Sequence, residues 1–121
     1  MKNSIIKEKS FLFAVRIVKL YQHISENKKE FILSKQLVRS GTSIGANICE
    51  ALQGASKKDF SNKMNISLKE AQETEYWLRL LHETHYLSEK EFQSLYEDSV
   101  ELIKMLTAIV KTSRANLDKP H

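Results

Sequence analysis

The chain has 121 residues, of which 41% are hydrophobic and 28% charged, and its formal net charge is +4. This length suits one domain with a single core, and the composition is ordinary for a globular protein. No run of about 18 apolar residues occurs, which excludes a membrane span, and charged residues come too early for a secretory signal. One cysteine, Cys49, cannot form an internal disulfide, so we expect a cytoplasmic protein.

Residues that interrupt helices are rare in this chain. The single proline is Pro120, and the three glycines are Gly41, Gly45 and Gly54. Because proline and glycine supply most turns and helix ends, their scarcity predicts a few long helices joined by short loops.

The first predicted helix covers residues 4–25, and the second covers residues 34–53. Ser34 is expected to be the N-cap of the second helix, and Gly54 is expected to end it in a left-handed conformation. Gly41 and Gly45 lie on its apolar side, where each costs about 1 kcal/mol relative to alanine. Their presence therefore predicts the close approach of a neighbouring helix.

The third and fourth predicted helices cover residues 57–85 and 89–113, and residues 116–121 are expected to form a flexible tail. Ser56 and Ser88 each stand three residues before an acid, as in a capping box. Each helix has one apolar stripe at spacings of three and four. The whole chain, 1–121, is therefore predicted to be an all-α domain, an antiparallel up-down-up-down four-helix bundle.

The second and third predicted helices also carry side chains that a bundle alone does not explain. Polar groups line up opposite the apolar stripe of the second helix, and Asn47 and Glu50 are within side-chain reach. This strip is either a solvated face or a network that meets another subunit or a ligand. It consists of Arg39, Ser43, Asn47 and Glu50.

Opposite the main stripe of the third helix, apolar side chains surround two acids. Tryptophan is enriched at the centres of protein interfaces, so we expect an oligomer interface here. The acids could pair with the basic first helix or with Arg39 of a neighbouring subunit. The alternative is that Trp77 lies at the bundle edge, half covered by another helix. The residues are Ile66, Glu70, Glu73, Trp77 and Leu80.

Positive charge is concentrated near the start of the chain. Up to Leu33, seven basic and three acidic residues account for the whole net charge of +4. Such a segment is either a solvated helix face or a surface that attracts nucleic acid through its phosphates. The candidate nucleic-acid-binding residues are Lys7, Lys9, Arg16, Lys19, Lys28, Lys29, Lys57 and Lys58.

No catalytic pattern occurs in the sequence. His82 and His85 are three residues apart, but neither the HExxH spacing of a zinc protease nor a Glu-x-x-His motif is present. Cys49 has no base placed to activate it, and no glycine-rich phosphate loop occurs. We therefore expect a protein that is not an enzyme and that uses no metal or cofactor.

Three stretches resemble a known family over residues 11–110: residues 36–51, with the pattern S-I-x-x-N-I-x-E, residues 56–60, and residues 66–78. They are similar to the four-helix bundle proteins encoded in intervening sequences of bacterial 23S ribosomal RNA genes. Cys49 and Ala51 depart from the alanine and frequent glycine expected there. The motif positions that the resemblance carries onto this chain are Arg39, Ser43, Asn47, Glu50 and Glu73.

The resemblance implies antiparallel bundles that assemble as ring-like homopentamers, with no catalytic residues. It extends distantly to the accessory variability protein of diversity-generating retroelements, a pentameric barrel that binds nucleic acid and a reverse transcriptase. The first hypothesis is therefore a homo-oligomer, pentameric by this resemblance, that binds RNA or DNA through its basic surface. The alternative is a protein interaction scaffold that recruits another protein and has no nucleic-acid role.

Overall fold

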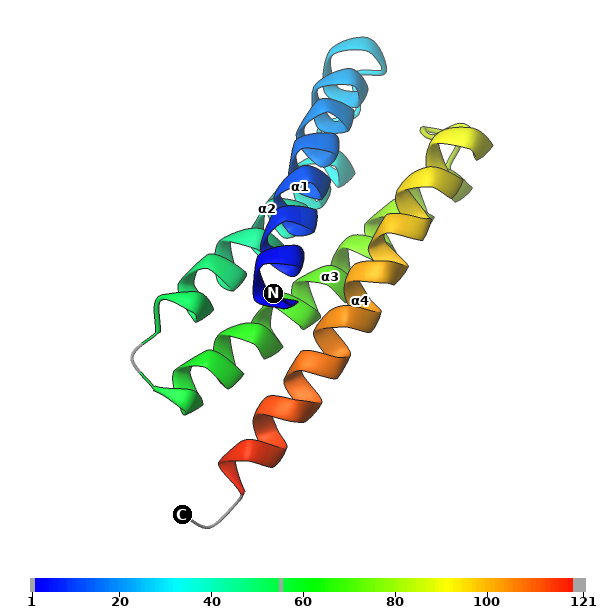
Figure 1. Ribbon diagram of the computed structural model, residues 1–121. Coiled ribbons are helices and arrows are strands. Elements are labelled where there is room, and N and C mark those ends of the chain that lie inside the picture. The colour runs from blue at the N-terminus through cyan, green and yellow to red at the C-terminus, as the bar shows by residue number, and fades with distance from the viewer. Residues whose placement is uncertain (1, 55, 119–121) are drawn as a thin grey trace.

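The computed structural model describes residues 2–54 and 56–118. Within these residues the chain forms four α-helices that alternate in direction (Figure 1). They are α1 (Lys2–Asn27), α2 (Leu33–Leu52), α3 (Lys57–Glu83) and α4 (Glu89–Leu117). Each helix packs on the next along the chain, and α1 also meets α4. The predicted all-α four-helix bundle is confirmed.

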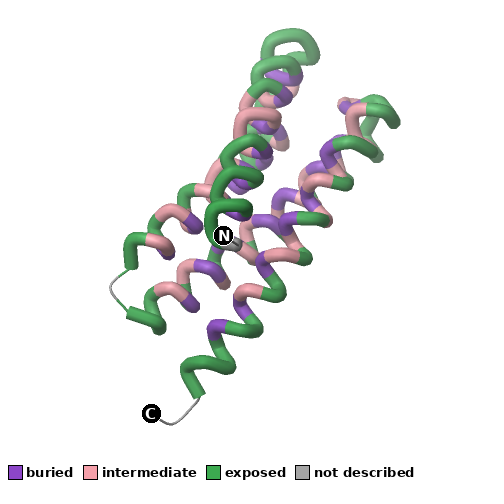
Figure 2. The backbone as a smooth tube through the Cα atoms, viewed as in Figure 1, coloured by how far each residue is buried: buried purple, intermediate pink, exposed green. Residues whose placement is uncertain are grey.

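The core is built from the apolar stripe of each helix. Ile17, Leu37, Leu78 and Leu106 have no exposed surface, and each represents a different helix. Figure 2 shows buried residues on the sides of the helices that face one another and exposed residues on the outer sides. Burying a large aliphatic side chain contributes about 1.5–3 kcal/mol, so these stripes hold the four helices together.

Small hydroxyl side chains lie among the apolar ones. The Thr74 hydroxyl donates to Ser40 Oγ at 2.9 Å, which joins α3 to α2. The Ser113 hydroxyl donates to Ser61 Oγ at 3.0 Å, which joins α4 to α3. Ser67 also donates to the carbonyl of Ile44, at 2.8 Å. Because each hydroxyl has a partner, its burial avoids the cost of an unsatisfied polar group.

The two glycines within α2 allow α1 to come close. A Cβ atom on Gly41 would lie 2.7 Å from Cγ2 of Ile17, nearer than real Cβ contacts allow. A Cβ atom on Gly45 would lie 3.2 Å from Oγ of Ser10. The predicted close approach is therefore confirmed, and the neighbouring helix is α1.

The start of α2 differs from the prediction. The N-cap position is Ile32, which makes no side-chain cap, and Ser34 is buried inside the helix. The carboxylate of Glu30 takes over this role and accepts hydrogen bonds from the backbone amides of Ile32, Leu33 and Ser34 at 2.8–3.1 Å. Burial opposes ionisation of Glu30, but these bonds outweigh it and lower the pKa.

Helix ends elsewhere also correct the prediction. Gly54 does not have a left-handed conformation; among the described residues, those with positive φ are Lys29, at 56°, and His85, at 68°. The amide of His85 bonds to the carbonyl of His82, and the amide of Tyr86 bonds to that of Leu81. These two bonds form a Schellman motif with histidine in the place usually taken by glycine, which ends α3 at Glu83, before residue 85.

The predicted serine caps of α3 and α4 are present. Ser56 Oγ accepts from the amide of Asp59, and Ser88 forms a full capping box with Glu91. The expected flexible tail, 116–121, starts too early, because α4 continues through Leu117. Residues 119–121 of that tail lie outside the described residues.

Candidate functional site

Four side chains form a cluster on the outer side of the α2–α3 pair. Arg39 donates to Glu70 Oε2 at 3.2 Å through Nη1, and to Glu73 through Nη2. The indole N–H of Trp77 donates to the same Glu73 oxygen at 3.1 Å. These four residues, Arg39, Glu70, Glu73 and Trp77, are called the α2–α3 cluster below. The acids therefore pair with Arg39 of their own chain, and not with α1 as the sequence had left open.

Hydrogen bonds within the cluster favour the ionised form of Glu73. The hydrogen bond from Arg39 lowers the pKa of Glu73 against the opposing effect of burial, and the Trp77 indole lowers it further. Trp77 itself is half-buried and packs against the core. The arrangement thus fixes the tryptophan at the bundle edge, and its role in an interface stays a prediction.

The rest of the predicted polar strip does not join this cluster through side chains. The Ser43 hydroxyl donates to the carbonyl of Arg39 at 2.7 Å, and the Asn47 amide donates to the carbonyl of Ser43 at 2.8 Å. Glu50 instead accepts from Lys63 of α3 at 3.4 Å. The donors of Ser43 and Asn47 are therefore satisfied within their own helix, and Asn47 and Glu50, which the sequence placed within reach of each other, bond to other groups.

Two of the basic candidates are neutralised by acids of α4. Lys9 pairs with Glu101 at 3.0 Å, and Arg16 pairs with Asp98 and also donates to Ser94. Arg16 is only half exposed as a result. These two bases therefore link α1 to α4 and are less available to a phosphate than the sequence suggested.

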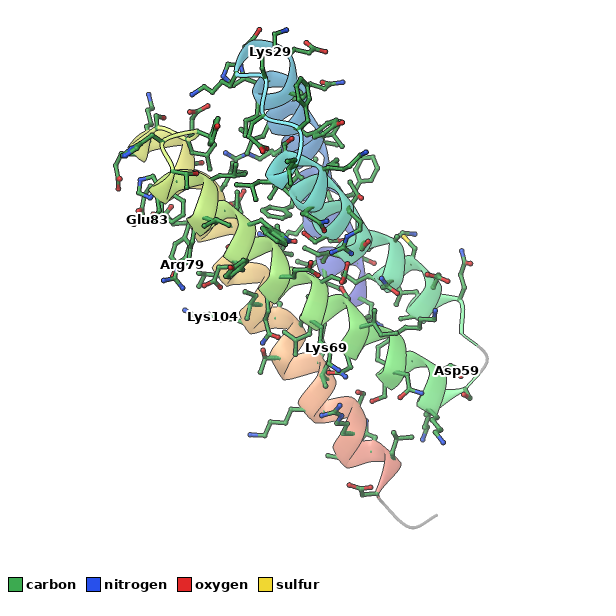
Figure 3. All side chains as sticks on the ribbon, turned by 180° about the vertical axis from the view of Figure 1, so that it is seen from behind. Lys29, Asp59, Lys69, Arg79, Glu83 and Lys104 are labelled. Carbon is green, nitrogen blue, oxygen red and sulfur yellow. The ribbon has the colours of Figure 1, made fainter. Side chains whose placement is uncertain are left out.

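The remaining basic candidates are exposed, but the fold separates them. Lys28 donates to the carbonyl of Tyr86 at 3.1 Å. Figure 3 shows Lys29 at one end of the bundle and Asp59, in the first turn of α3, at the other. The bundle thus has a basic end at Lys28 and Lys29 and a second one at the start of α3, with further bases along α1. The exposed candidates are Lys7, Lys19, Lys28, Lys29, Lys57 and Lys58.

Several large apolar side chains are exposed, and two pairs of them lie on helices that do not contact each other; the others are Ile5, Phe31, Ile32 and Leu117. On α1, Phe11 is 66% exposed and Leu12 is 54% exposed, and these two residues are called the α1 face. On α3, Ile66 is 42% exposed and Tyr76 is 57% exposed, and these form the α3 face. Since α1 touches only α2 and α4, the two faces lie on opposite sides of the bundle.

The sequence interpretation selected Ile66 of the α3 face but missed Tyr76 and the whole α1 face. Ile66 was selected as an interface residue, and Leu80, selected with it, is half-buried. The α1 face was missed, although a signal existed: residues 11–15 are apolar without interruption. A helix cannot point five consecutive side chains toward one core, so some of them had to face outward.

His82 and His85, which the sequence placed three residues apart, have structural roles in the fold. His82 bonds to Glu89 at 2.8 Å through Nε2, and its ring stacks on Phe92 with centroids 4.2 Å apart. His85 forms the helix end described above. Within residues 2–54 and 56–118, no three histidine, cysteine or acidic side chains gather in a way that could hold a metal ion.

Comparison with known proteins identifies the family. The family model described as 23S rRNA-intervening sequence protein matches residues 2–108. The chain belongs to this family. The resemblance seen in the motifs of α2 and α3 is therefore confirmed over most of the chain.

A solved relative of this intervening-sequence protein has nearly the same fold. It is a crystal structure of a protein with unknown function from the S23 ribosomal protein family of Bacteroides thetaiotaomicron. The two chains are 55% identical with a TM-score of 0.90, and the match covers 92% of this chain and 99% of that chain. No curated protein matches the chain. Among the described residues, no helix is both long and apolar enough to cross a membrane.

Proposed function

We propose that this intervening-sequence protein is a non-enzymatic, cytoplasmic homo-oligomer that binds RNA or DNA. The observation that carries the proposal is the pair of apolar faces on opposite sides of the bundle. Aromatic and large aliphatic side chains that cluster in water mark interaction surfaces. Phe11 and Tyr76, which are more than half exposed, are the largest of these side chains.

The positions of the two faces favour a ring. If the α1 face of one copy contacts the α3 face of the next, each copy uses two different surfaces. Such a heterologous contact forms a closed ring when the rotation between copies closes. A ring of five copies is the assembly that the family resemblance implies.

Nucleic-acid binding is supported by the free bases. Lys7, Lys19 and Lys29 are exposed and form no ion pair among the described residues, unlike Lys9 and Arg16. In a ring, every copy repeats these charges, so several phosphates could be neutralised together. Contacts of this kind read the backbone, so affinity should fall steeply with salt and depend little on sequence.

Solution mass and absorbance test the proposal together. Size exclusion with light scattering should give a multiple of the 14.0 kDa chain, and an excess of absorbance at 260 nm would report bound nucleic acid. Nuclease-treated protein should then shift RNA or DNA at low salt. A particle of one subunit would contradict assembly, and no shift at low salt would contradict nucleic-acid binding.

A matched pair of triple variants tests the basic surface. Lys7, Lys19 and Lys29 would be replaced by glutamine, and the control would replace Lys90, Lys104 and Lys111 of α4, which are also exposed. Both variants lose the same charge. We expect the first to weaken binding and reduce its salt dependence, whereas the control should bind nearly as well as the wild type; equal losses would indicate a nonspecific effect of net charge.

Complementary variants test the ring contact. Phe11→Asp and Tyr76→Asp should each break assembly, and Thr107→Asp, at an exposed position of α4, should not. Mixing the first two variants leaves one intact α1 face and one intact α3 face, so they should form dimers. If the faces instead contact their own kind, each variant should dimerise alone and mixing should change nothing.

The alternative is a scaffold that recruits another protein and has no nucleic-acid role. The same exposed apolar faces favour it, because nucleic acid does not need them. A partner that is recovered with the oligomer after nuclease treatment, and lost in Tyr76→Asp, would support this function.

A further inference from the structure

The bundle is open at the end where α1 begins. Figure 1 shows the C-terminal half of α4 continuing beyond the N-terminus of α1. A cavity of about 770 Å³ lies there, between the end of α2, the start of α3 and the last turns of α4. Asn3 and Ile5 of α1 stand at its border. This cavity is called the open-end groove.

One wall of the groove is a continuous helix face. The lining residues of α4 recur at spacings of three and four from Met105 to Asn116, and they extend over about 17 Å at 1.5 Å per residue. Leu52 of α2 and Phe60 of α3 line the groove from the other helices. The α4 residues are Met105, Ala108, Ile109, Thr112, Ser113 and Asn116.

The shape of the groove matches a helix. Farther along the bundle, α1 packs against α2 and also meets α4. Asn3 and Ile5, in the first turn of α1, line the groove, so it lies where α1 begins. The axes of packed helices lie about 8–10 Å apart, depending on the side chains at the contact. The open-end groove therefore has the position of a fourth helix that the described chain does not supply at this level.

The charge of the lining indicates which charge a bound partner should carry. Among the described residues that line the groove, Lys57 is the one that is charged, and none of the described acids forms an ion pair with it. It lies in the first turn of α3, where the helix dipole adds positive potential. An apolar face with an acidic side chain at this corner would fit the groove.

We infer that the open-end groove binds an amphipathic helix of about three turns from another protein, with an acidic residue against Lys57. This is the helix-in-groove mode of recognition, in which apolar anchors recur at helical spacing. The inference does not depend on the oligomer or on nucleic-acid binding.

Other occupants fit less well. A second copy would offer the α1 face, where Lys7 and Lys19 are repelled by Lys57, or the α3 face, where Glu70 and Glu73 are already held by Arg39. A nucleic acid needs several phosphate contacts, and the described residues give the groove a single cation on a mostly apolar lining. An acidic helix satisfies both the apolar wall and the charge.

Two designed peptides provide the probe. Each would be about 14 residues long, labelled with fluorescein, with leucines at helical spacings of three and four; the other face is glutamate in one peptide and lysine in the other. Fluorescence anisotropy with the full chain measures binding. We expect the glutamate peptide to bind and the lysine peptide to bind at least about tenfold more weakly.

Matched substitutions locate the site. Ala108→Asp places a charge on an exposed position of the groove, and Ala115→Asp makes the same change on α4 outside the lining. We expect the first to reduce affinity for the glutamate peptide at least about tenfold and the second to leave it unchanged. Melting curves would show that both variants fold.

Charge reversal checks the acidic contact. Lys57→Glu should weaken binding of the glutamate peptide and strengthen binding of the lysine peptide. Lys58→Glu changes the neighbouring residue, which does not line the groove, and should have smaller effects on both affinities. The inference fails if neither peptide binds, or if Ala108→Asp and Ala115→Asp have the same effect on peptide affinity. It also fails if a single-stranded oligonucleotide displaces the peptide and Ala108→Asp abolishes binding of that oligonucleotide.

Discussion

Two of the four helix–helix contacts, called seams below, differ in how they are built. The α2–α3 seam is the most extensive helix contact of the chain, and the α1–α4 seam is the least extensive. Thr74 bonds to Ser40 in the interior of the α2–α3 seam, and Arg39 bonds to Glu73 on its surface. The α1–α4 seam is bridged by exposed pairs such as Lys9 with Glu101.

This difference shows which helix contacts contribute most to the stability of the bundle. Exposed ion pairs contribute about 0–1 kcal/mol each, because water and salt screen them. Buried contacts between small side chains bring the helix backbones together and contribute through dispersion and apolar burial. The bundle is therefore held in chain order, α1 on α2, α2 on α3 and α3 on α4, and the closing contact of α1 with α4 adds the least.

The largest test concerns how α4 is held. Leu106 of α4 has no exposed surface and lies in the common core. Leu106→Ala should therefore lower the free energy of unfolding by about 2–5 kcal/mol. A denaturant titration measures this loss, and a loss much below that range would mean that α4 depends on its ion pairs to α1 more than on its stripe.

The second test concerns the attachment of α1. Gly41→Ala adds a methyl group that would meet Ile17, and such overpacking costs about 1–3 kcal/mol, partly offset by the helix propensity of alanine. We expect a net loss of stability on thermal unfolding. In a double-mutant cycle with Ile17→Ala, most of this loss should disappear; additive losses would place its cause elsewhere.

The third test compares one arginine from each seam. Arg39→Ala leaves the half-buried Glu70 and Glu73 without their cation, and should cost about 1–2 kcal/mol. Arg16→Ala removes an exposed pair with Asp98 and should cost less than about 1 kcal/mol. Equal losses in urea would show that the two seams are alike in strength.

The smallest expected effect is a loss of folding stability at acidic pH. The pKa values of Glu30, Glu73 and Glu91 lie below the ordinary 4.5 in the folded chain. The unfolded chain therefore binds protons first, and the stability from these carboxylates is complete above about pH 4.5 and declines as the pH falls further. Arg39→Ala should flatten this decline, because it removes the main cause of the Glu73 shift; an unchanged slope between pH 5 and 3 would contradict this assignment.

Most of the fold could be predicted from the sequence because it depends on local chemistry. Long apolar periodicities and rare helix breakers define the helices, and Ser56 and Ser88 define two of their starts. The cap by Glu30 was missed because its carboxylate reaches amides that only the folded loop brings near. Gly54 was chosen as a left-handed end because glycine prefers that conformation, but α2 ends with the ordinary turn bond from the Gly54 amide to the carbonyl of Ala51. The left-handed residues follow α1 and α3 instead, at Lys29 and His85.

The candidate site could be predicted only in part. The alignment of Arg39 with other polar groups, and of Glu73 with Trp77, followed from helical periodicity alone. Periodicity does not reveal whether Arg39 meets the acids of its own chain or of a neighbour, because that depends on how α2 and α3 are paired. Lys29 and Lys57 lie at opposite ends of the bundle, and predicting this likewise requires the lengths and directions of the helices.

The buried hydroxyls favour one longitudinal alignment of the helices. A slip of α4 by one turn along α3 would shift it by about 5.4 Å and separate Ser113 from Ser61. Ser113 would then keep only its bond to the carbonyl of Val110, and the loss of the bond between the helices would cost about 0.5–1.5 kcal/mol. This pair of serines therefore contributes to how far α4 extends past the first residues of α1, and hence to the depth of the open-end groove.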